Sequence, residues 1–483
     1  MKTVRDFLYL SKIEITNMKK LLLLLLTIFT TSMYSQDITG EWNGILKIPG
    51  KQLTIIFKIS KLGEGYSATL DSPDQKVTGV QVTTTTFVSP VLKLSIVGAG
   101  IEYEGILGED KIIRGNFKQG GNTFPMDISK EKVEKTLPKR PQEPAKPYAY
   151  NSEDITFENN KEAITLAGTF TYPKKKGTFP VVILISGSGA QNRDEELLGH
   201  KPFLVLADYL TKNGIAVLRF DDRGTAQSKG NFSLATTENF ATDVEAAINY
   251  LKTRKEINKS KIGLIGHSEG GLIAPMIASK SKDVNFIVLL SGPGIRGSEL
   301  LLLQQELVKK ASGISDTDIE QSKTFYKGLF EIITNVKNET EMRTAFENYL
   351  KLSLQTMPDS EKGGMSNADF ITLMEKQLLS PWMQYFLKYD PAPALEKVTC
   401  PVLALIGEKD LQVPPKENLE AIKIALEKGG NKKATLKELP TLNHLFQESN
   451  TGSPSEYAEI EQTFSPKALE EIKNWINAQV KAK

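Results

Sequence analysis

A serine between two glycines is the feature that most constrains this chain. Ser268 stands in Gly266-His-Ser-Glu-Gly270, directly after the apolar run Lys261–Ile265 and before a stretch typical of the start of a helix. Such a pentapeptide recurs by chance, but here the flanking glycines permit a sharp strand-to-helix turn that exposes the hydroxyl. The sequence therefore predicts that Ser268 is a nucleophile on a strand–turn–helix. The alternative is an ordinary serine in a surface turn.

The surrounding pattern predicts an α/β fold with a mostly parallel sheet. From residue 151 onward, apolar runs alternate with helical stripes, and runs that are apolar throughout are expected for strands buried on both faces. The runs are Val181–Ile185, Ala216–Phe220, Lys261–Ile265, Phe286–Leu290, Val402–Ile406 and Ala434–Leu439. These features predict one domain over residues 151–483.

The spacing of these runs breaks once. Roughly one hundred residues separate Leu290 from Val402, far more than an ordinary crossover needs. Helical patterning fills much of the gap, over Leu300–Ala311, Asp316–Val336 and Glu339–Leu352. We expect a helical cap at about residues 294–392 rather than a third independent domain.

The region before the α/β domain has a different character. Short, β-branched or aromatic runs separated by turn residues predict a small all-β domain over residues 36–132, an antiparallel barrel or sandwich. The clearest runs are Leu53–Ile59, Tyr66–Leu70, Val91–Ile96 and Ile112–Phe117. Residues 133–150 carry prolines at every third position from Pro138 to Pro147. That spacing predicts a stiff polyproline linker.

The amino terminus predicts export. Met18-Lys-Lys precedes the apolar run Leu21–Phe29, and small and polar residues follow up to Ser35. This is the pattern of a signal peptide over residues 1–35, cleaved after Ser35, with residues 1–17 as an upstream extension. A membrane anchor is the alternative, but a bilayer span needs about 20 apolar residues. The expected location is secreted or periplasmic, without a stable membrane anchor.

Charge and cysteine content exclude several classes of function. The net charge is +2, from 60 basic and 58 acidic residues, which gives no reason to expect a nucleic acid partner. Cys400 is the only cysteine, so no intramolecular disulfide can form, and its apolar surroundings predict a buried side chain. No His/Cys spacing predicts a metal site, and we expect no cofactor.

A nucleophilic serine needs a base, and the chain has only three histidines. His267 adjoins the serine inside the turn, and His200 precedes a helix early in the domain. His444 follows the last predicted strand, which gives the order serine, acid, histidine. Asp410, in Gly407-Glu-Lys-Asp410 after the penultimate strand, is the expected acid and is favoured over Glu408.

Acyl transfer also needs donors for an oxyanion. One is expected to be the backbone N–H of Glu269, directly after the nucleophile. The other is expected from the loop Ser186–Gly189, with Ser188 N–H the first choice and Gly187 N–H the second. Two clusters of mixed charge, Asn192–Glu195 and Asp221–Gly224, are interpreted as structural support beside the site.

Together these segments resemble the bacterial carboxylesterases of the α/β-hydrolase superfamily, near the EstD-like esterases and the serine-aminopeptidase-like hydrolases. The resemblance covers about residues 150 to 480. The matching segments are Ile185–Glu195, Phe220–Ser228, Gly266–Gly271, Gly407–Asp410 and Leu442–Phe446. The resemblance implies a triad of Ser268, Asp410 and His444 that acts through an acyl-enzyme. Two positions depart from the common pattern, with Ser186 in place of a histidine and Ala226 in place of a glycine.

The expected function is hydrolysis of a small-molecule carboxylic ester. An aminopeptidase-like peptidase or a thioesterase would use the same triad, and these alternatives stay open at this point. A non-enzymatic binding protein would predict a broken triad, whereas all three members are present in order. The acyl and alcohol groups, the role of the β-domain, the state of the cap and the oligomeric state are not predicted.

Overall fold

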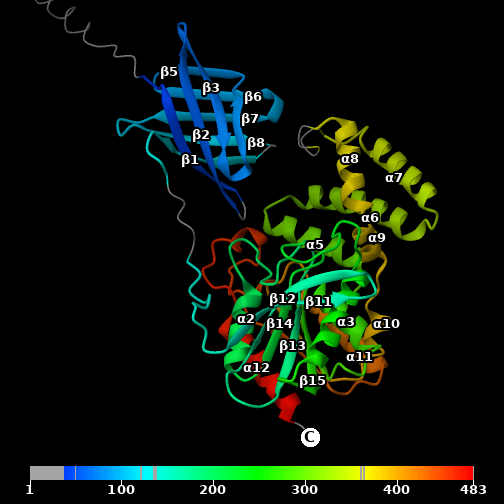
Figure 1. Ribbon diagram of the computed structural model, residues 1–483. Helices are drawn as coiled ribbons and strands as arrows, with labels where there is room; N and C mark the ends of the chain where they lie inside the picture. Colours follow the sequence, from blue (N-terminus) through cyan, green and yellow to red (C-terminus); the bar gives the residue numbers. More distant parts are fainter. Residues whose placement is uncertain are drawn as a thin grey trace, which may run out of the picture. The chain divides into compact units, whose positions relative to one another are not determined.

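The computed structural model describes residues 37–48, 51–119, 122–133, 139–358, 362 and 365–481 (Figure 1). The predicted signal peptide, residues 1–35, lies outside the described residues. Within the described ranges, no helix combines the length and the apolar character needed to cross a membrane. The chain divides into two compact units, one holding β1–β10 and the other β11–α12.

The first unit is an antiparallel sheet, as the sequence predicts. Its strands are β1 (Gly40–Ile48), β2 (Lys51–Leu62), β3 (Gly65–Ser72), β4 (Val77–Gln81), β5 (Thr84–Val88), β6 (Val91–Ile96), β7 (Ile101–Leu107), β8 (Ile112–Gln119), β9 (Asn122–Pro125) and β10 (Ile128–Ser129). They run in the order β4-β3-β2-β1-β10-β8-β7-β6-β5, with β9 paired to β8. Alternate side chains point inward, and Trp42, Phe57, Tyr103 and Phe117 form much of the buried interior.

The second unit is built on an eight-stranded sheet. Its strands are β11 (Asn151–Asn159), β12 (Ile164–Tyr172), β13 (Phe179–Ile185), β14 (Ala216–Phe220), β15 (Ile257–His267), β16 (Phe286–Leu290), β17 (Val402–Gly407) and β18 (Ala434–Leu439). The order is β11-β12-β14-β13-β15-β16-β17-β18. The pairs from β14 to β18 run parallel, while β11 and β12 add an antiparallel edge.

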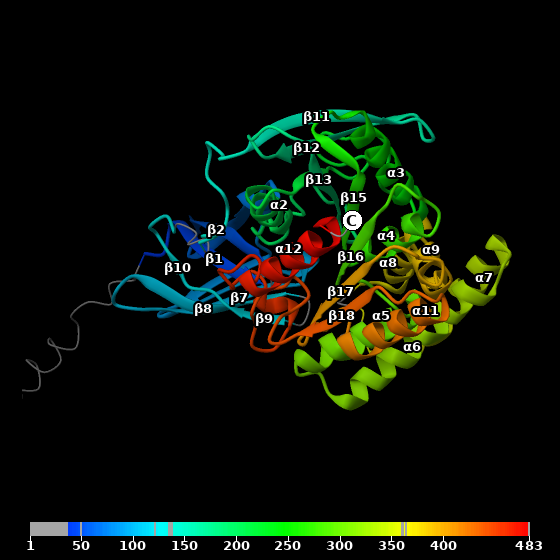
Figure 2. The same ribbon diagram turned by 90° about the horizontal axis from the view of Figure 1, so that it is seen from below.

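Helices cover both faces of this sheet (Figure 2). One face packs against α2 (Pro202–Lys212) and α12 (Pro466–Lys481), and the other against α3 (Thr237–Thr253), α4 (Gly270–Ala278) and α11 (Pro415–Lys428). Strand β13 shows why the runs are apolar throughout: its alternate side chains enter the cores on the two faces of the sheet. Val182 and Leu184 belong to the core on the α2 side, whereas Val181, Ile183 and Ile185 belong to the core on the α3 side.

Further helices lie in the chain between β16 and β17. They are α5 (Gly297–Ala311), α6 (Asp316–Asn335), α7 (Glu339–Ser353), α8 (Asn367–Leu378), α9 (Pro381–Lys388) and the short α10 (Ala392–Leu395). Ser315, Asn338, Ser366 and Ser380 each cap one of these helices by accepting a backbone N–H. Helices α5 to α9 gather at one end of the sheet (Figure 1), where Leu300 and Phe386 pack against Leu272 of α4.

The described part of the proline-rich segment is attached to the second unit. Residues 139–150 contain turns and no helix or strand. The Arg140 guanidinium donates to the carbonyls of Ile460 (2.9 Å) and Ala458 (2.8 Å), and to those of Leu198 and Gly199. The Gln142 side chain bonds to the backbone at residues 463–464. This end of the segment is therefore held by specific contacts.

Replacing Arg140 by alanine tests this attachment. Arg140→Ala leaves four carbonyls without their charged donor, and we expect the free energy of unfolding of the second unit to fall by about 1–3 kcal/mol. Chemical denaturation measures the loss, and limited proteolysis should show faster cleavage within residues 139–150. The exposed neighbour variant, Lys139→Ala, is the control. Equal unfolding curves for the two variants would contradict the attachment.

Candidate active site

Ser268 lies in the tight turn that the sequence predicts, between the end of β15 at His267 and the start of α4 at Gly270. Its φ is 51°, in the left-handed region that side chains rarely adopt. A Cβ at Gly266 would lie 1.9 Å from the carbonyl oxygen of Gly270, so this turn requires glycine. The Ser268 N–H donates to the Leu290 carbonyl at 2.9 Å, which ties the turn to the end of β16.

Asp410 and His444 lie together at the ends of neighbouring strands. The His444 Nδ1 atom is 2.9 Å and 3.0 Å from the two Asp410 carboxylate oxygens. Asp410 Oδ1 also accepts the backbone N–H groups of Gln412 and Val413. Both side chains are buried. Because Nδ1 faces a carboxylate, it carries the proton, and Nε2 is left as the basic atom.

Hydrogen bonds within the loop that carries His444 hold this loop in place. The buried Asn443 side chain accepts the N–H groups of Leu445 (3.0 Å) and Gln447 (2.9 Å), an arrangement that closes the turn around His444. At Gly407 a Cβ would lie 2.2 Å from the Leu442 carbonyl, so the end of β17 and the histidine loop can meet only at glycine. This close approach brings the Asp410 loop beside His444.

Three segments converge around Ser268. The ring centroids of His267 and His444 are 4.8 Å apart, and a Cβ at Gly187 would lie 3.2 Å from the Ser268 Cβ. Neither Ser268 Oγ nor His444 Nε2 is hydrogen-bonded within the described part of the chain. Catalytic hydrogen bonds are often long before substrate binds and tighten afterwards. The structure thus brings the elbow, the histidine loop and the glycine loop to one place.

The N–H groups expected to be oxyanion donors differ in whether they already donate a hydrogen bond within the protein. Within the described residues, the N–H groups of Glu269 and Ser188 have no hydrogen-bond acceptor, and Ser188 is exposed. The Gly187 N–H instead donates to Glu195 Oε1 at 2.7 Å. The Gly187 N–H, the second choice of oxyanion donor predicted from the sequence, is therefore already engaged in a hydrogen bond. Glu269 and Ser188 are the pair left free to hold an oxyanion.

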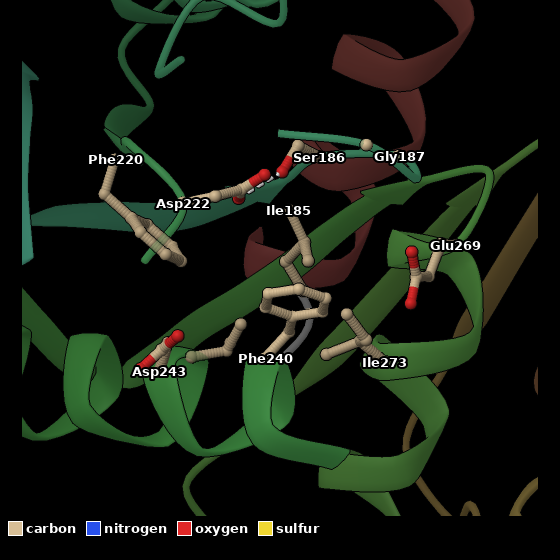
Figure 3. Close-up of a pocket in the computed structure, with 11 residues that line it drawn as sticks. Ile185, Ser186, Gly187, Phe220, Asp222, Phe240, Asp243, Glu269 and Ile273 are labelled. Atoms are coloured by element: carbon tan, nitrogen blue, oxygen red, sulfur yellow. Dashed lines mark hydrogen bonds between the residues drawn. The ribbon is translucent and has the colours of Figure 1, made fainter. Parts of the chain in front are cut away.

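The carboxyl groups of Asp222, Asp243 and Glu269 line a small cavity beside the glycine loop (Figure 3). Asp222 accepts the Ser186 hydroxyl at 2.7 Å and the Gln191 N–H at 2.9 Å. Burial raises the pKa of Asp222 to about 8, and the nearby charges of Glu269 and Glu195 add to the shift. The cavity is otherwise lined largely by apolar side chains, namely Ile185, Phe220, Phe240, Val244 and Ile273.

Glu269 contacts the helices inserted after β16. Its Oε1 atom accepts the Thr237 hydroxyl at 2.7 Å and the Trp382 indole N–H of α9 at 2.8 Å. Burial raises the pKa of this carboxyl group as well. The residue that follows Ser268 is therefore held through its side chain by α3 and α9, while its backbone N–H has no acceptor among the described residues.

The mixed-charge clusters brace the loops around the site. Arg193 pairs with Asp221 at 2.7 Å, and Arg223 pairs with Asp243 at 2.7 Å. Glu195 is different, because it reaches His267 at 2.9 Å, and no sequence spacing links two residues so far apart. Neither this contact nor that of Trp382 with Glu269 could be predicted from the sequence. Among the described residues, no group of three or more His, Cys, Asp or Glu is placed to hold a metal ion.

The raised pKa of Asp222 predicts a pH-dependent stability. In the unfolded chain an aspartate has a pKa near ~3.9, so between about pH 4 and pH 8 it loses its proton while folded Asp222 keeps it. The free energy of unfolding should fall as the pH rises through this window. Asp222→Asn cannot ionise, so its melting temperature relative to wild type should be higher at pH 8 than at pH 5.

Thermal unfolding at the two pH values measures this difference. Ser186→Ala is the matched control, because it removes a hydrogen-bond donor but keeps the carboxyl group, and it should retain the pH dependence. A difference between Asp222→Asn and wild type that is equal at pH 5 and pH 8 would contradict the assignment.

Comparison with known proteins agrees with this architecture. A family model described as serine aminopeptidase, S33, matches residues 201–349, a stretch that includes Ser268. Esterase EstD of Thermotoga maritima is 26% identical over 331 residues, which is 68% of each chain. An uncharacterized 31.7 kDa protein of Escherichia coli is 26% identical over 272 residues, covering 54% of this chain and 83% of that protein.

Solved structures include a similar esterase from Pyrococcus furiosus, with 15% identity, a TM-score of 0.41, and coverage of 72% of this chain and 98% of that one. The family match and the relationship to EstD are those that the segments around Ser268, Asp410 and His444 predict. The chain is therefore a hydrolase, similar to the serine aminopeptidase family over residues 201–349 and to esterase EstD over 68% of its length.

Proposed function

We propose that this hydrolase cleaves small-molecule carboxylic esters through an acyl-enzyme, with Ser268 as nucleophile, His444 as base and Asp410 as the acid that orients it. The Asp410–His444 pair carries the proposal. Two contacts of 2.9 and 3.0 Å fix the tautomer in which Nε2 is basic. An ordinary loop histidine has no need of a buried carboxylate that is itself held by two backbone N–H groups.

In the first half of the reaction, Ser268 Oγ attacks the ester carbonyl carbon while His444 Nε2 takes the hydroxyl proton. The carbonyl oxygen becomes an oxyanion, and the N–H groups of Glu269 and Ser188 are proposed to stabilise it. Collapse of this intermediate breaks the ester C–O bond. His444 returns its proton to the leaving alcohol, and the acyl group remains on Ser268.

The second half repeats these roles with water. His444 removes a proton from a water molecule that attacks the acyl-enzyme carbonyl. The oxyanion forms again at the same donors, and collapse returns the proton to Ser268 Oγ and releases the carboxylic acid. Asp410 stays ionised throughout and stabilises the imidazolium that forms in each half.

We further propose that α5 to α9 form a cap over the site. The support is the contact between Trp382 of α9 and Glu269, one residue from the nucleophile, together with the packing of Leu300 and Phe386 on α4. A cap of this kind would shape the acyl pocket and limit the access of water. The small all-β unit, the signal peptide and a secreted or periplasmic location belong to the same proposal.

The aminopeptidase alternative needs a carboxylate that binds a substrate ammonium group. Glu269 and Asp222 are carboxyl groups of the site that have no cation as a partner, but burial raises the pKa of both, to about 8 for Asp222. A raised pKa makes a carboxyl group a weaker partner for a cation. Glu269 Oε1 also accepts two donors from the protein itself. These features favour an ester over a peptide substrate.

Turnover of a chain-length series of p-nitrophenyl esters, compared with aminoacyl p-nitroanilides, tests the proposal. We expect ester hydrolysis to exceed anilide hydrolysis, and Ser268→Ala to lower kcat by about 10⁴-fold or more. Anilide turnover above that of every ester would overturn the ester assignment. Ester turnover that survives in Ser268→Ala would overturn the nucleophile.

The acid is tested by a pair of variants. Asp410→Asn leaves an amide that disfavours the required His444 tautomer, and kcat should fall by about 10³- to 10⁴-fold. Glu408→Gln is the control, because Glu408 lies in the same loop and only accepts the Thr441 N–H at 2.8 Å. It should keep kcat within about threefold of wild type, well inside the range of a lost surface contact. The reverse order of effects would assign the acid to Glu408.

A further inference from the structure

His267 has an unusual environment for a side chain next to a nucleophile. Its ring is buried, with 7% of the residue exposed. Nδ1 lies 2.9 Å from Glu195 Oε1, and Nε2 lies 2.9 Å from the backbone carbonyl oxygen of His444. Both ring nitrogens therefore face oxygen atoms, and the three residues come from the end of β15 and from two separate loops.

The hydrogen-bond partners of the His267 ring determine which of its nitrogen atoms carry protons. A backbone carbonyl only accepts hydrogen bonds, so Nε2 of His267 must carry a proton. Glu195 Oε1 accepts the Gly187 N–H at 2.7 Å, and as a carboxylate oxygen it accepts from Nδ1 too, so that Nδ1 donates as well. A ring with two donating nitrogens is an imidazolium. Buried charges persist when they are paired and hydrogen-bonded, as this one is.

We propose that His267 is a positioning residue: a buried imidazolium that, with Glu195, joins the nucleophile turn, the His444 loop and the glycine loop into one rigid unit. The proposal rests on the proposed function, because it assigns a role in the same acyl transfer. Glu195 is the centre of the unit, since one of its oxygens accepts both the His267 ring and the Gly187 N–H.

Each of the three bonds holds a part of the proposed machinery. The bond to the His444 carbonyl fixes the backbone of the base, whose ring centroid lies 4.8 Å from that of His267. The bond through Glu195 to Gly187 fixes the residue directly before Ser188, a proposed oxyanion donor. His267 is itself adjacent to Ser268. Displacement of any of these groups by about 1 Å can cost on the order of 10²-fold in rate.

The charges around the ring support the same assignment. The titratable groups that face it are Glu195, from the segment after the glycine loop, His444, and Asp410 behind His444. Burial alone would lower the pKa of His267, but Glu195, the His444 carbonyl and Asp410 together raise it above the ordinary value. The ring also lies beside the glycine loop, because a Cβ at Gly187 would be 3.5 Å from His267 Nδ1.

Two variants of His267 each keep one of the two hydrogen bonds of its ring and remove the other. His267→Gln places an amide N–H near the position of Nε2 and keeps only the donor to His444, whereas His267→Asn places one near Nδ1 and keeps only the donor to Glu195. We expect each to lower kcat for p-nitrophenyl esters by about 10- to 100-fold. KM should change by less than about threefold, because the bonds act on the reacting groups and not on bound ester.

Glu195→Gln tests the charge. The variant keeps an oxygen that can accept the Gly187 N–H but removes the negative charge opposite the imidazolium. We expect a fall in kcat similar to that of the histidine variants. The double variant with His267→Gln should be no worse than either single variant, because the residues act as one unit. Additive losses in the double variant would show that they act separately.

Asn431→Ala is the control for general damage. Asn431 is also buried and donates to two backbone carbonyls, at 2.9 Å each, but near the start of β17, at the end of that strand opposite Asp410. It should lower the melting temperature while kcat stays within about threefold of wild type, as expected for a lost structural bond away from the site. A purely structural role for His267 would give the same pattern.

The protonation state has a direct spectroscopic test. In the full-length protein with ¹⁵N-labelled histidine, both ring nitrogens of His267 should show protonated imidazolium signals at pH 7.5, assigned by their loss in His267→Gln. In Glu195→Gln the same ring should become neutral. A neutral His267 in the wild-type protein, or wild-type kcat in His267→Gln and His267→Asn, would overturn the proposal. Neither result would affect Ser268, whose failure appears only in Ser268→Ala.

Discussion

The turn at Ser268 depends on backbone segments that lie closer together than side chains allow. A Cβ at Gly266 would meet the Gly270 carbonyl oxygen at 1.9 Å, and a Cβ at Gly270 would meet the Ile185 carbonyl oxygen at 2.2 Å. These contacts lock the end of β15, the start of α4 and the end of β13 against one another. The positive φ of Ser268 is held in place by this packing and not by the serine itself.

The remaining parts of the site depend on this junction. The end of β13 leads directly into the glycine loop, so the loop with Ser188 begins where Gly270 packs. A second close approach, at Gly407 against the Leu442 carbonyl, brings the Asp410 loop and the His444 loop together in the same way. In a parallel sheet the carboxyl ends of the strands share one edge, and glycines at those ends let the loops meet there.

The sequence was most informative where burial leaves a simple pattern. Strands β13, β14, β16 and β17 are buried on both faces, and their apolar runs mark them to within one or two residues. The edge strand β11 was not predicted, because NSEDITFEN contains three charged residues and only two of its residues are buried. Strand β15 begins at Ile257, earlier than its apolar part, for the same reason.

The residues of the candidate site also differ in how far the sequence could predict them. Ser268, Asp410 and His444 could be named from local turns and chain order, and the structure brings Asp410 and His444 into contact. The hydrogen bond from the Gly187 N–H to Glu195 could not be predicted from the sequence. Glu195 lies in a cluster of mixed charge whose composition indicates only surface ion pairing. Neither composition nor spacing records which long-range pairs a fold creates.

The buried charges of the site suggest why its ionisable residues are arranged as they are. Asp410 and Glu195 are each paired with a histidine ring, and each is further hydrogen-bonded to backbone N–H groups. Asp222 and Glu269, which have no cation as a partner, have raised pKa values instead. Unpaired negative charge beside the nucleophile would oppose a developing oxyanion. Raised pKa values at these two carboxyl groups, together with the imidazolium proposed at His267, reduce that opposition before the substrate arrives.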